Sequence, residues 1–69
     1  MYYMTVIQVF SDGSPTAKAI YDYNSYNDAL SALYSTMFSS LANENLSEVT
    51  CLIMDSECIA KKYERWTRS

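Results

Sequence analysis

The chain of 69 residues contains no histidine, one glycine, one proline and two cysteines. Without histidine, a Cys–His nucleophilic pair is excluded, and so is the side chain that most often binds zinc together with cysteine. The single glycine, Gly13, cannot build the glycine-rich loop that holds phosphates. Two cysteines alone are too few for a structural metal site. The sequence therefore predicts a protein that is not an enzyme and that has no catalytic residues, no metal site and no cofactor.

The two cysteines flank the polar stretch 55–57. A turn centred on that stretch pairs Cys58 with Met54 or Ile53 rather than with Cys51, so we expect two reduced thiols in a reducing compartment. The chain begins without a basic and apolar leader. Its longest aliphatic or sulfur-containing run, residues 51–54, is far shorter than the roughly 20 residues of a membrane span. These features predict a soluble, cytoplasmic protein that does not associate with membranes.

Charge is distributed unevenly along the chain, whose formal net charge is −3. Residues 1–60 hold one lysine against seven carboxylates, whereas residues 61–69 hold four cations against one carboxylate. The acidic body repels nucleic acid as it approaches, so a nucleic-acid partner is not the favoured expectation.

The first and third β-rich segments, Tyr2–Phe10 and Val49–Met54, are apolar on both alternating faces, which is typical of central strands. Asp12-Gly13 predicts a turn after the first segment. The segments Thr16–Asp22 and Cys58–Trp66 are more polar, and their charges suit the edges of a sheet.

Between the second and third of these segments, the sequence predicts a helix from Tyr26 to Ala42. Ser25 and Asp28 have the spacing of an N-terminal cap, and Asp28 suits the positive end of the helix dipole. The apolar residues recur at helical intervals. They are Leu30, Leu33, Tyr34, Met37 and Leu41.

Together the segments predict a single α+β domain over residues 1–69. Its element order is β-β-α-β-β, with a four-stranded antiparallel sheet in the order 2-1-3-4 and one helix packed on one face. One helix cannot cover both faces of a sheet whose central strands are apolar on both sides. We therefore expect a protein interface, either in a homodimer or with a heterologous target, because large uncovered apolar patches are uncommon on monomers. The alternative is a twisted sheet whose edge side chains and C-terminal tail shield the second face.

Seven tyrosines in so short a chain also favour an interface, because tyrosine buries a large ring and keeps a polar tip. The helix adds a surface rich in serine and threonine without a charged residue from Ala29 to Asn43, which could pack on a partner or simply be solvated. Tyr3 and Tyr34 are assigned to the core. The predicted interface residues are Tyr2, Met4, Tyr21, Tyr23, Tyr26, Ser35 and Ser39.

The basic C-terminal segment supplies an alternative function, a weak nucleic-acid-binding protein. Basic side chains around an aromatic ring can hold phosphates and stack on a base. The same residues also protect an edge strand from unwanted pairing, and strand alternation divides the cations between two faces. The residues of this alternative are Lys61, Lys62, Arg65, Trp66 and Arg68.

Residues 10–21, the Asp28-Ala29-Leu30 helix start, the strand at residues 49–54 and the late Trp66 together resemble a group of short proteins from phages and mobile elements of Gram-positive gut bacteria. The group has no assigned activity. The resemblance implies a bacterial host cell and a phage-type inhibitor of a bacterial defence enzyme, similar to anti-CRISPR proteins, that acts by occlusion. It leaves a structural phage accessory protein as a further alternative.

Overall fold

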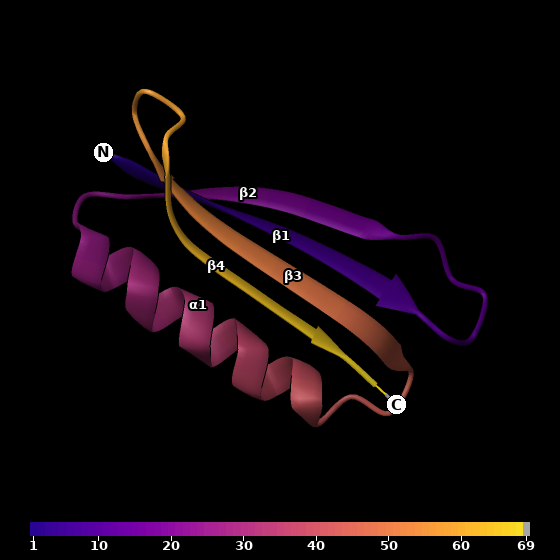
Figure 1. Ribbon diagram of the computed structural model, residues 1–69. Coiled ribbons are helices and arrows are strands. Elements are labelled where there is room, and N and C mark those ends of the chain that lie inside the picture. Colours follow the sequence, from indigo (N-terminus) through magenta and orange to yellow (C-terminus); the bar gives the residue numbers. More distant parts are fainter. Residues whose placement is uncertain (69) are drawn as a thin grey trace.

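Two apolar strands form the centre of the sheet, as their sequence patterns predict. The computed structural model describes residues 1–68, with β1 (Tyr2–Phe10), β2 (Ala17–Tyr23), α1 (Tyr26–Leu41), β3 (Leu46–Asp55) and β4 (Ala60–Thr67). The strands form one antiparallel sheet in the order β2-β1-β3-β4, which confirms the predicted α+β topology. α1 lies along one face of this sheet, where it packs on β3, β1 and β2 (Figure 1).

The core lies between α1 and the two central strands. β1 contributes Met4 and Val6 to it, and β3 contributes Val49, Cys51 and Ile53. The register places Met4 beside Ile53 and Val6 beside Cys51, so alternation directs all five side chains toward the helix. The core is completed by residues that are also buried, namely Ala29, Leu33 and Leu46.

α1 begins where its capping sequence predicts. The Ser25 hydroxyl oxygen accepts a hydrogen bond from the Asp28 N–H at 3.1 Å. The helix ends at Leu41, one residue before the predicted end. Its buried side contains Ala29, Leu33 and Ser40, whereas the side chain of Tyr34 is 51% exposed. The assignment of Tyr34 to the core is therefore wrong. The helix has two apolar stripes: the one with Ala29 and Leu33 meets the sheet, whereas the one with Tyr34, Phe38 and Leu41 is exposed.

The turn between β3 and β4 is wider than the sequence predicts, and β4 begins at Ala60 instead of Cys58. The Asp55 carboxylate accepts the N–H groups of Glu57 at 2.9 Å and Ile59 at 3.0 Å, and Cys58 adopts a φ of 64°. The register shifts there, so that Met54 faces Ala60 and the predicted pairing of Cys58 with Met54 or Ile53 is wrong. Both cysteines are free thiols, as expected, with Cys51 buried and Cys58 exposed.

The boundaries of β2 and β3 also differ from the predicted ones. β2 covers Ala17–Tyr23, and β3 begins at Leu46, three residues before the predicted start. In the β1–β2 turn, the Asp12 carboxylate accepts the Ser14 N–H at 3.0 Å and Gly13 has a φ of 88°, which glycine adopts without strain. Within residues 1–68, no helix has the length and apolar character that crossing a membrane requires.

Candidate functional site

The sheet face opposite α1 has no helix over it within residues 1–68. In its central row, Thr5 faces Ile20 on one side and Leu52 on the other, and Leu52 faces Tyr63. The outermost two of these side chains are strongly accessible, with Ile20 65% and Tyr63 59% exposed. We call this surface the open face and define it by its apolar residues: Tyr3, Ile7, Val9, Ile20, Leu52, Met54 and Tyr63.

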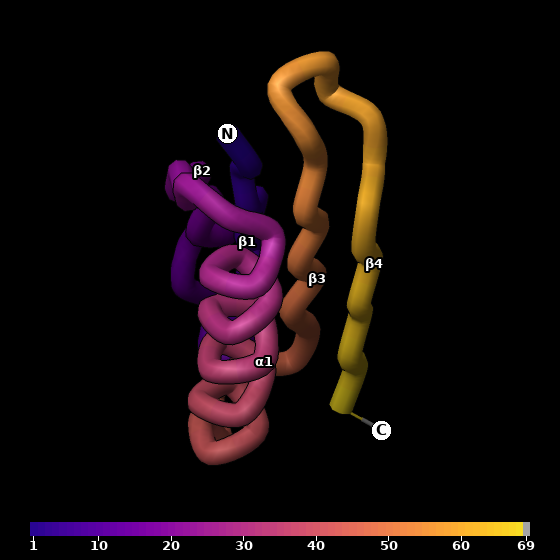
Figure 2. The backbone as a smooth tube through the Cα atoms, turned by 90° about the vertical axis from the view of Figure 1, so that its left-hand side faces the viewer, coloured from indigo at the N-terminus to yellow at the C-terminus, as the bar shows by residue number. Residues whose placement is uncertain are grey.

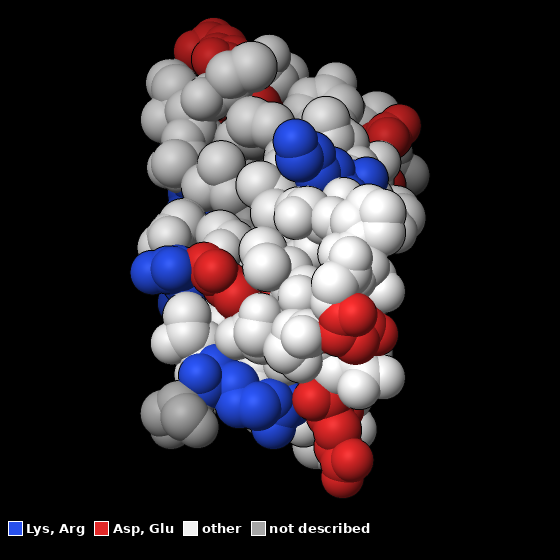
Figure 3. Space-filling view, turned by 90° about the vertical axis from the view of Figure 1, so that its right-hand side faces the viewer, with Lys and Arg blue, Asp and Glu red and all other residues white. Residues whose placement is uncertain are grey.

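Charged side chains lie at the margins of the open face. Lys18 and Asp22 project from β2, and at the opposite edge the Arg65 guanidinium pairs with the Glu48 carboxylate, with Nε donating at 2.6 Å. Figure 3 views the molecule from the side opposite to Figure 2 and shows a broad uncharged area with basic and acidic groups around it. The open face therefore has an apolar centre and a charged border.

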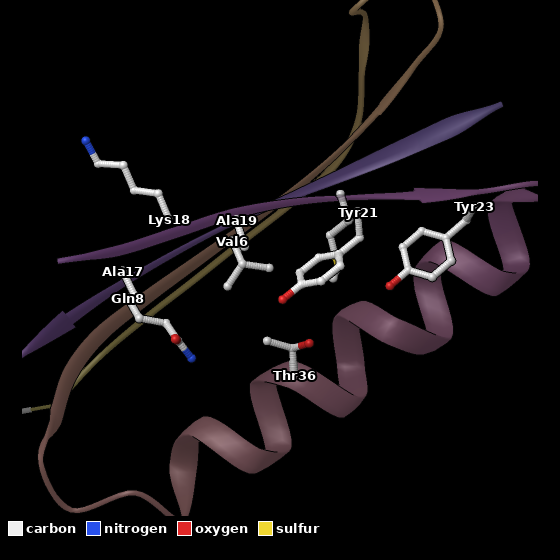
Figure 4. Close-up of a pocket in the computed structure, with 9 residues that line it drawn as sticks. Val6, Gln8, Ala17, Lys18, Ala19, Tyr21, Tyr23 and Thr36 are labelled. Atoms are coloured by element: carbon white, nitrogen blue, oxygen red, sulfur yellow. The ribbon is translucent and has the colours of Figure 1, made fainter.

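A second surface is the groove between α1 and β2. It consists of a cavity of about 290 Å³ beside β2 and a hollow of about 300 Å³ beside the C-terminal half of α1, and both are lined by Gln8 and Thr36. Figure 4 shows Tyr21 and Tyr23 directed from β2 toward the helix, with Thr36 directed back toward them and Lys18 pointing away. We call this the α1–β2 groove.

The groove brings together five of the predicted interface residues. Met4, Tyr21 and Tyr23 line its first part, and Ser35 and Ser39 line its second. Ser40 also lines the second part, but it is largely buried and its hydroxyl donates to the Thr36 carbonyl oxygen at 2.8 Å. The tyrosine and serine predictions therefore fall on one continuous surface, although on different elements.

The two remaining predicted residues, Tyr2 and Tyr26, lie elsewhere. Their rings contact each other edge to face, with centroids 5.7 Å apart, and both pack against the core. Although Met4 lines the groove, it is only 1% exposed because alternation along β1 places it beneath α1, so its prediction as an interface residue is wrong. Tyr3, which the sequence assigned to the core, lies instead on the open face beside Met54. The residues that the sequence reasoning missed, Ile20, Leu52 and Tyr63, become recognisable only when the register aligns them in one row.

The cations of the C-terminal segment are engaged by groups of the protein itself. Lys61 pairs with Asp55 at 3.5 Å and Lys62 with Glu64 at 3.2 Å. The pKa of Lys62 is raised, first by this hydrogen bond to Glu64 and then by the nearby Tyr34 hydroxyl. Arg68 stacks over the Trp66 ring at 4.9 Å from its centroid. With both lysines paired to carboxylates and Arg68 held against a ring and carbonyl groups, these cations are a poor match for a phosphate backbone.

Burial and hydrogen bonding also shift the pKa values of one thiol and two carboxyls. Burial raises the pKa of the Cys51 thiol, which keeps it protonated and unreactive. The pKa of the Asp12 carboxyl is lowered, chiefly because Ser14 donates hydrogen bonds to it. The pKa of the Asp55 carboxyl is also lowered, chiefly because the Ile59 N–H donates to it. Residues 1–68 contain no group of three or more cysteine, aspartate or glutamate side chains that could hold a metal ion.

The chain matches no protein-family model, no curated protein and no solved structure.

Proposed function

We propose that the protein is a small non-enzymatic protein-binding module whose contact surface is the open face. The observation that carries this proposal is a row of side chains that crosses all four strands and that no helix of residues 1–68 covers. Ile20, Leu52 and Tyr63 are its apolar members, and Thr5 is the β1 residue between the first two. Contiguous apolar surface of this kind is uncommon on monomers and marks interaction sites.

The composition of the open face favours a protein partner. Its centre is mainly aliphatic and aromatic, with Thr5 and Thr50 as the polar members, and its border holds Lys18, Asp22 and the Arg65–Glu48 pair. Protein interfaces have this organisation, with an apolar core that excludes water and a charged rim that sets orientation. A nucleic-acid partner, the alternative reading of the basic strand, is disfavoured because the cations of that strand are already paired with carboxylates or held against carbonyl groups.

Binding through a rigid sheet face implies action by occlusion. The module would cover a surface of its target and contribute no chemistry of its own. The resemblance to short phage proteins suggests the class of target, a bacterial defence enzyme, and we propose inhibition of such an enzyme in the bacterial cytoplasm as the function.

Two tyrosines of similar exposure make a matched test. Tyr63 lies on the open face and is 59% exposed, whereas Tyr34 lies on α1 and is 51% exposed. A photo-reactive phenylalanine analogue at position 63 should cross-link a distinct protein when the module is illuminated in bacterial lysate. The same analogue at position 34 should leave that protein unlabelled.

The control for folding is thermal denaturation, which should show equal midpoints for the two labelled proteins. Labelling of the same target from position 34 alone would place the contact on the helical layer and contradict the proposal. Absence of any specific adduct from position 63, in lysates of phage-susceptible Gram-positive bacteria, would also overturn it.

A further inference from the structure

β2 is an edge strand whose outer side is free within residues 1–68. Its seven residues, Ala17–Tyr23, pair with β1 without a register shift and contain no proline or bulge. Ile20 lies at the midpoint of the strand and is 65% exposed. A regular, uninterrupted edge of this kind is a template for pairing with another strand.

We propose that two copies of the chain associate by antiparallel pairing of their β2 strands about a two-fold axis at Ile20. In this register Ile20 faces Ile20 of the second copy, and Lys18 faces Asp22 of the second copy. On the other side of the strand, Ala19 faces Tyr21 and Ala17 faces Tyr23 of the second copy. In each of these pairs the two facing side chains lie on the same side of the sheet, as antiparallel pairing about such an axis requires.

The charges of β2 complement each other in this arrangement. Lys18 and Asp22 are both exposed, and neither forms a salt bridge with a residue of the described chain. They lie equally far from Ile20 on the same side of the strand. The two-fold axis therefore creates the Lys18–Asp22 pair twice, and opposite charges at directly facing positions stabilise a sheet.

The sizes of the remaining side chains also complement each other. The small residues Ala17 and Ala19 line the cavity of about 290 Å³ in the α1–β2 groove (Figure 4). The pairing brings Tyr23 and Tyr21 of the second copy beside these alanines, on the helix side of the sheet. Their rings can then extend the apolar packing into the groove, which the monomer leaves open beneath the β2 edge.

The opposite edge, β4, lacks this self-complementarity. A two-fold axis at Tyr63 sets Lys61 opposite Arg65, and an axis at Glu64 sets two carboxylates opposite each other. An axis at Lys62 likewise sets two lysines opposite each other. Like charges at facing positions destabilise pairing, so the second copy is expected at β2 and not at β4.

The two-fold axis runs perpendicular to the sheet. Both helices then lie on one side, and the two open faces join on the other as one continuous surface. The dimer does not depend on the proposed function, since its evidence lies in the β2 edge. It would nonetheless double the contact surface that the proposed function uses.

A disulfide test addresses the register directly. Residues that face each other in an antiparallel pair have Cα atoms about 4.5–5.5 Å apart, a separation that a disulfide spans. In a Cys58→Ser background, which removes the exposed native thiol, Ile20→Cys should give a covalent dimer under mild oxidation at micromolar concentration. Tyr63→Cys, an equally accessible control on β4, should remain largely monomeric.

A charge exchange then tests the contacts in the protein with its native cysteines. Lys18→Asp or Asp22→Lys alone places like charges in both facing pairs and should weaken the dimer roughly tenfold in sedimentation equilibrium. The double variant restores opposite charges and should recover the affinity to within about threefold. Circular dichroism of each variant is the control that it is folded.

Two results would overturn the proposal. One is a wild-type protein that stays monomeric at about 1 mM, and the other is equal cross-linking from positions 20 and 63. A monomer that still labels a target from position 63 would refute the dimer and leave the proposed function standing.

Discussion

The guanidinium group of Arg68 holds the end of the chain's last strand against the connection between α1 and β3. Its Nη2 donates to the Asn43 carbonyl oxygen at 2.8 Å, and its Nε donates to the Leu46 carbonyl oxygen at 3.1 Å. The last turn of α1 contains no basic residue. Arg68 therefore brings a positive charge from β4 close to the negative end of the helix dipole.

Replacing Arg68 tests this contact. Arg68→Lys keeps the charge but loses the fork that reaches two carbonyls, so the free energy of unfolding should fall by about 1 kcal/mol. Arg65→Lys is the matched control on the same strand, since its exposed pairing with Glu48 should change stability by at most about 0.5 kcal/mol. Urea denaturation measures both. Equal losses in the two variants would show that Arg68 has no special structural role.

The turn at Asp55 should make stability depend on pH. Turn N–H groups and Lys61 lower the pKa of this carboxyl below 3.8, so its stabilising effect is present above that value and is lost as pH falls through the folded-state pKa. Asp55→Asn keeps a hydrogen-bond acceptor but removes the charge. Its stability deficit relative to the wild type should be clear at pH 7 and should shrink below about pH 3.8. A deficit of the same size at both pH values would attribute the effect to geometry instead of charge.

The topology could be predicted from the sequence because each element follows its own physical period. Alternation identifies the strands, the apolar content of both faces identifies the two central ones, and the capping pair at Ser25 and Asp28 marks the start of the helix. The boundaries around residues 55–60 could not be predicted in this way. They depend on one carboxylate that accepts two turn N–H groups and on a left-handed residue that is not glycine, Cys58.

The candidate surface was predicted in outline, but not residue by residue. That one helix leaves a face uncovered follows from the composition of β1 and β3. How much of its own face the helix buries depends on how far the helix reaches across the sheet, and Figure 2 shows β4 extending beyond it. Apolar residues surround much of α1, so its period alone does not separate the buried Leu33 from the exposed Tyr34 and Phe38.

The two apolar stripes of α1 should differ sharply in their effect on stability. Leu33 is fully buried, and Leu33→Ala should cost about 2–5 kcal/mol, a large part of the stability of so small a domain. Phe38 is 76% exposed, and Phe38→Ala should change the unfolding free energy by about 0.5 kcal/mol or less. If Leu33→Ala fails to fold, Leu33→Met should still fold with a loss below about 1.5 kcal/mol. Comparable costs at positions 33 and 38 would contradict the packing described here.

The two thiols should report separately on the surface and the core. Cys58 is exposed in the β3–β4 turn and should react at once with a disulfide reagent at pH 8. Cys51 is fully buried and its pKa is raised by burial, so it should react only when the sheet opens. The folded thiol has a pKa above the ordinary value of 9.0, so the thiol of the unfolded chain loses its proton at lower pH. Raising the pH through 9.0 should therefore favour unfolding and speed the reaction.

Thiol counting with time gives the measurement for this prediction. The wild type should show one fast and one slow thiol, and a Cys58→Ser variant should lose only the fast phase. In a folded Leu33→Met variant the slow phase should accelerate, because the weakened core opens more often. Two fast thiols in the wild type would mean that α1 does not protect β3, and the core packing beneath the helix would then be wrong.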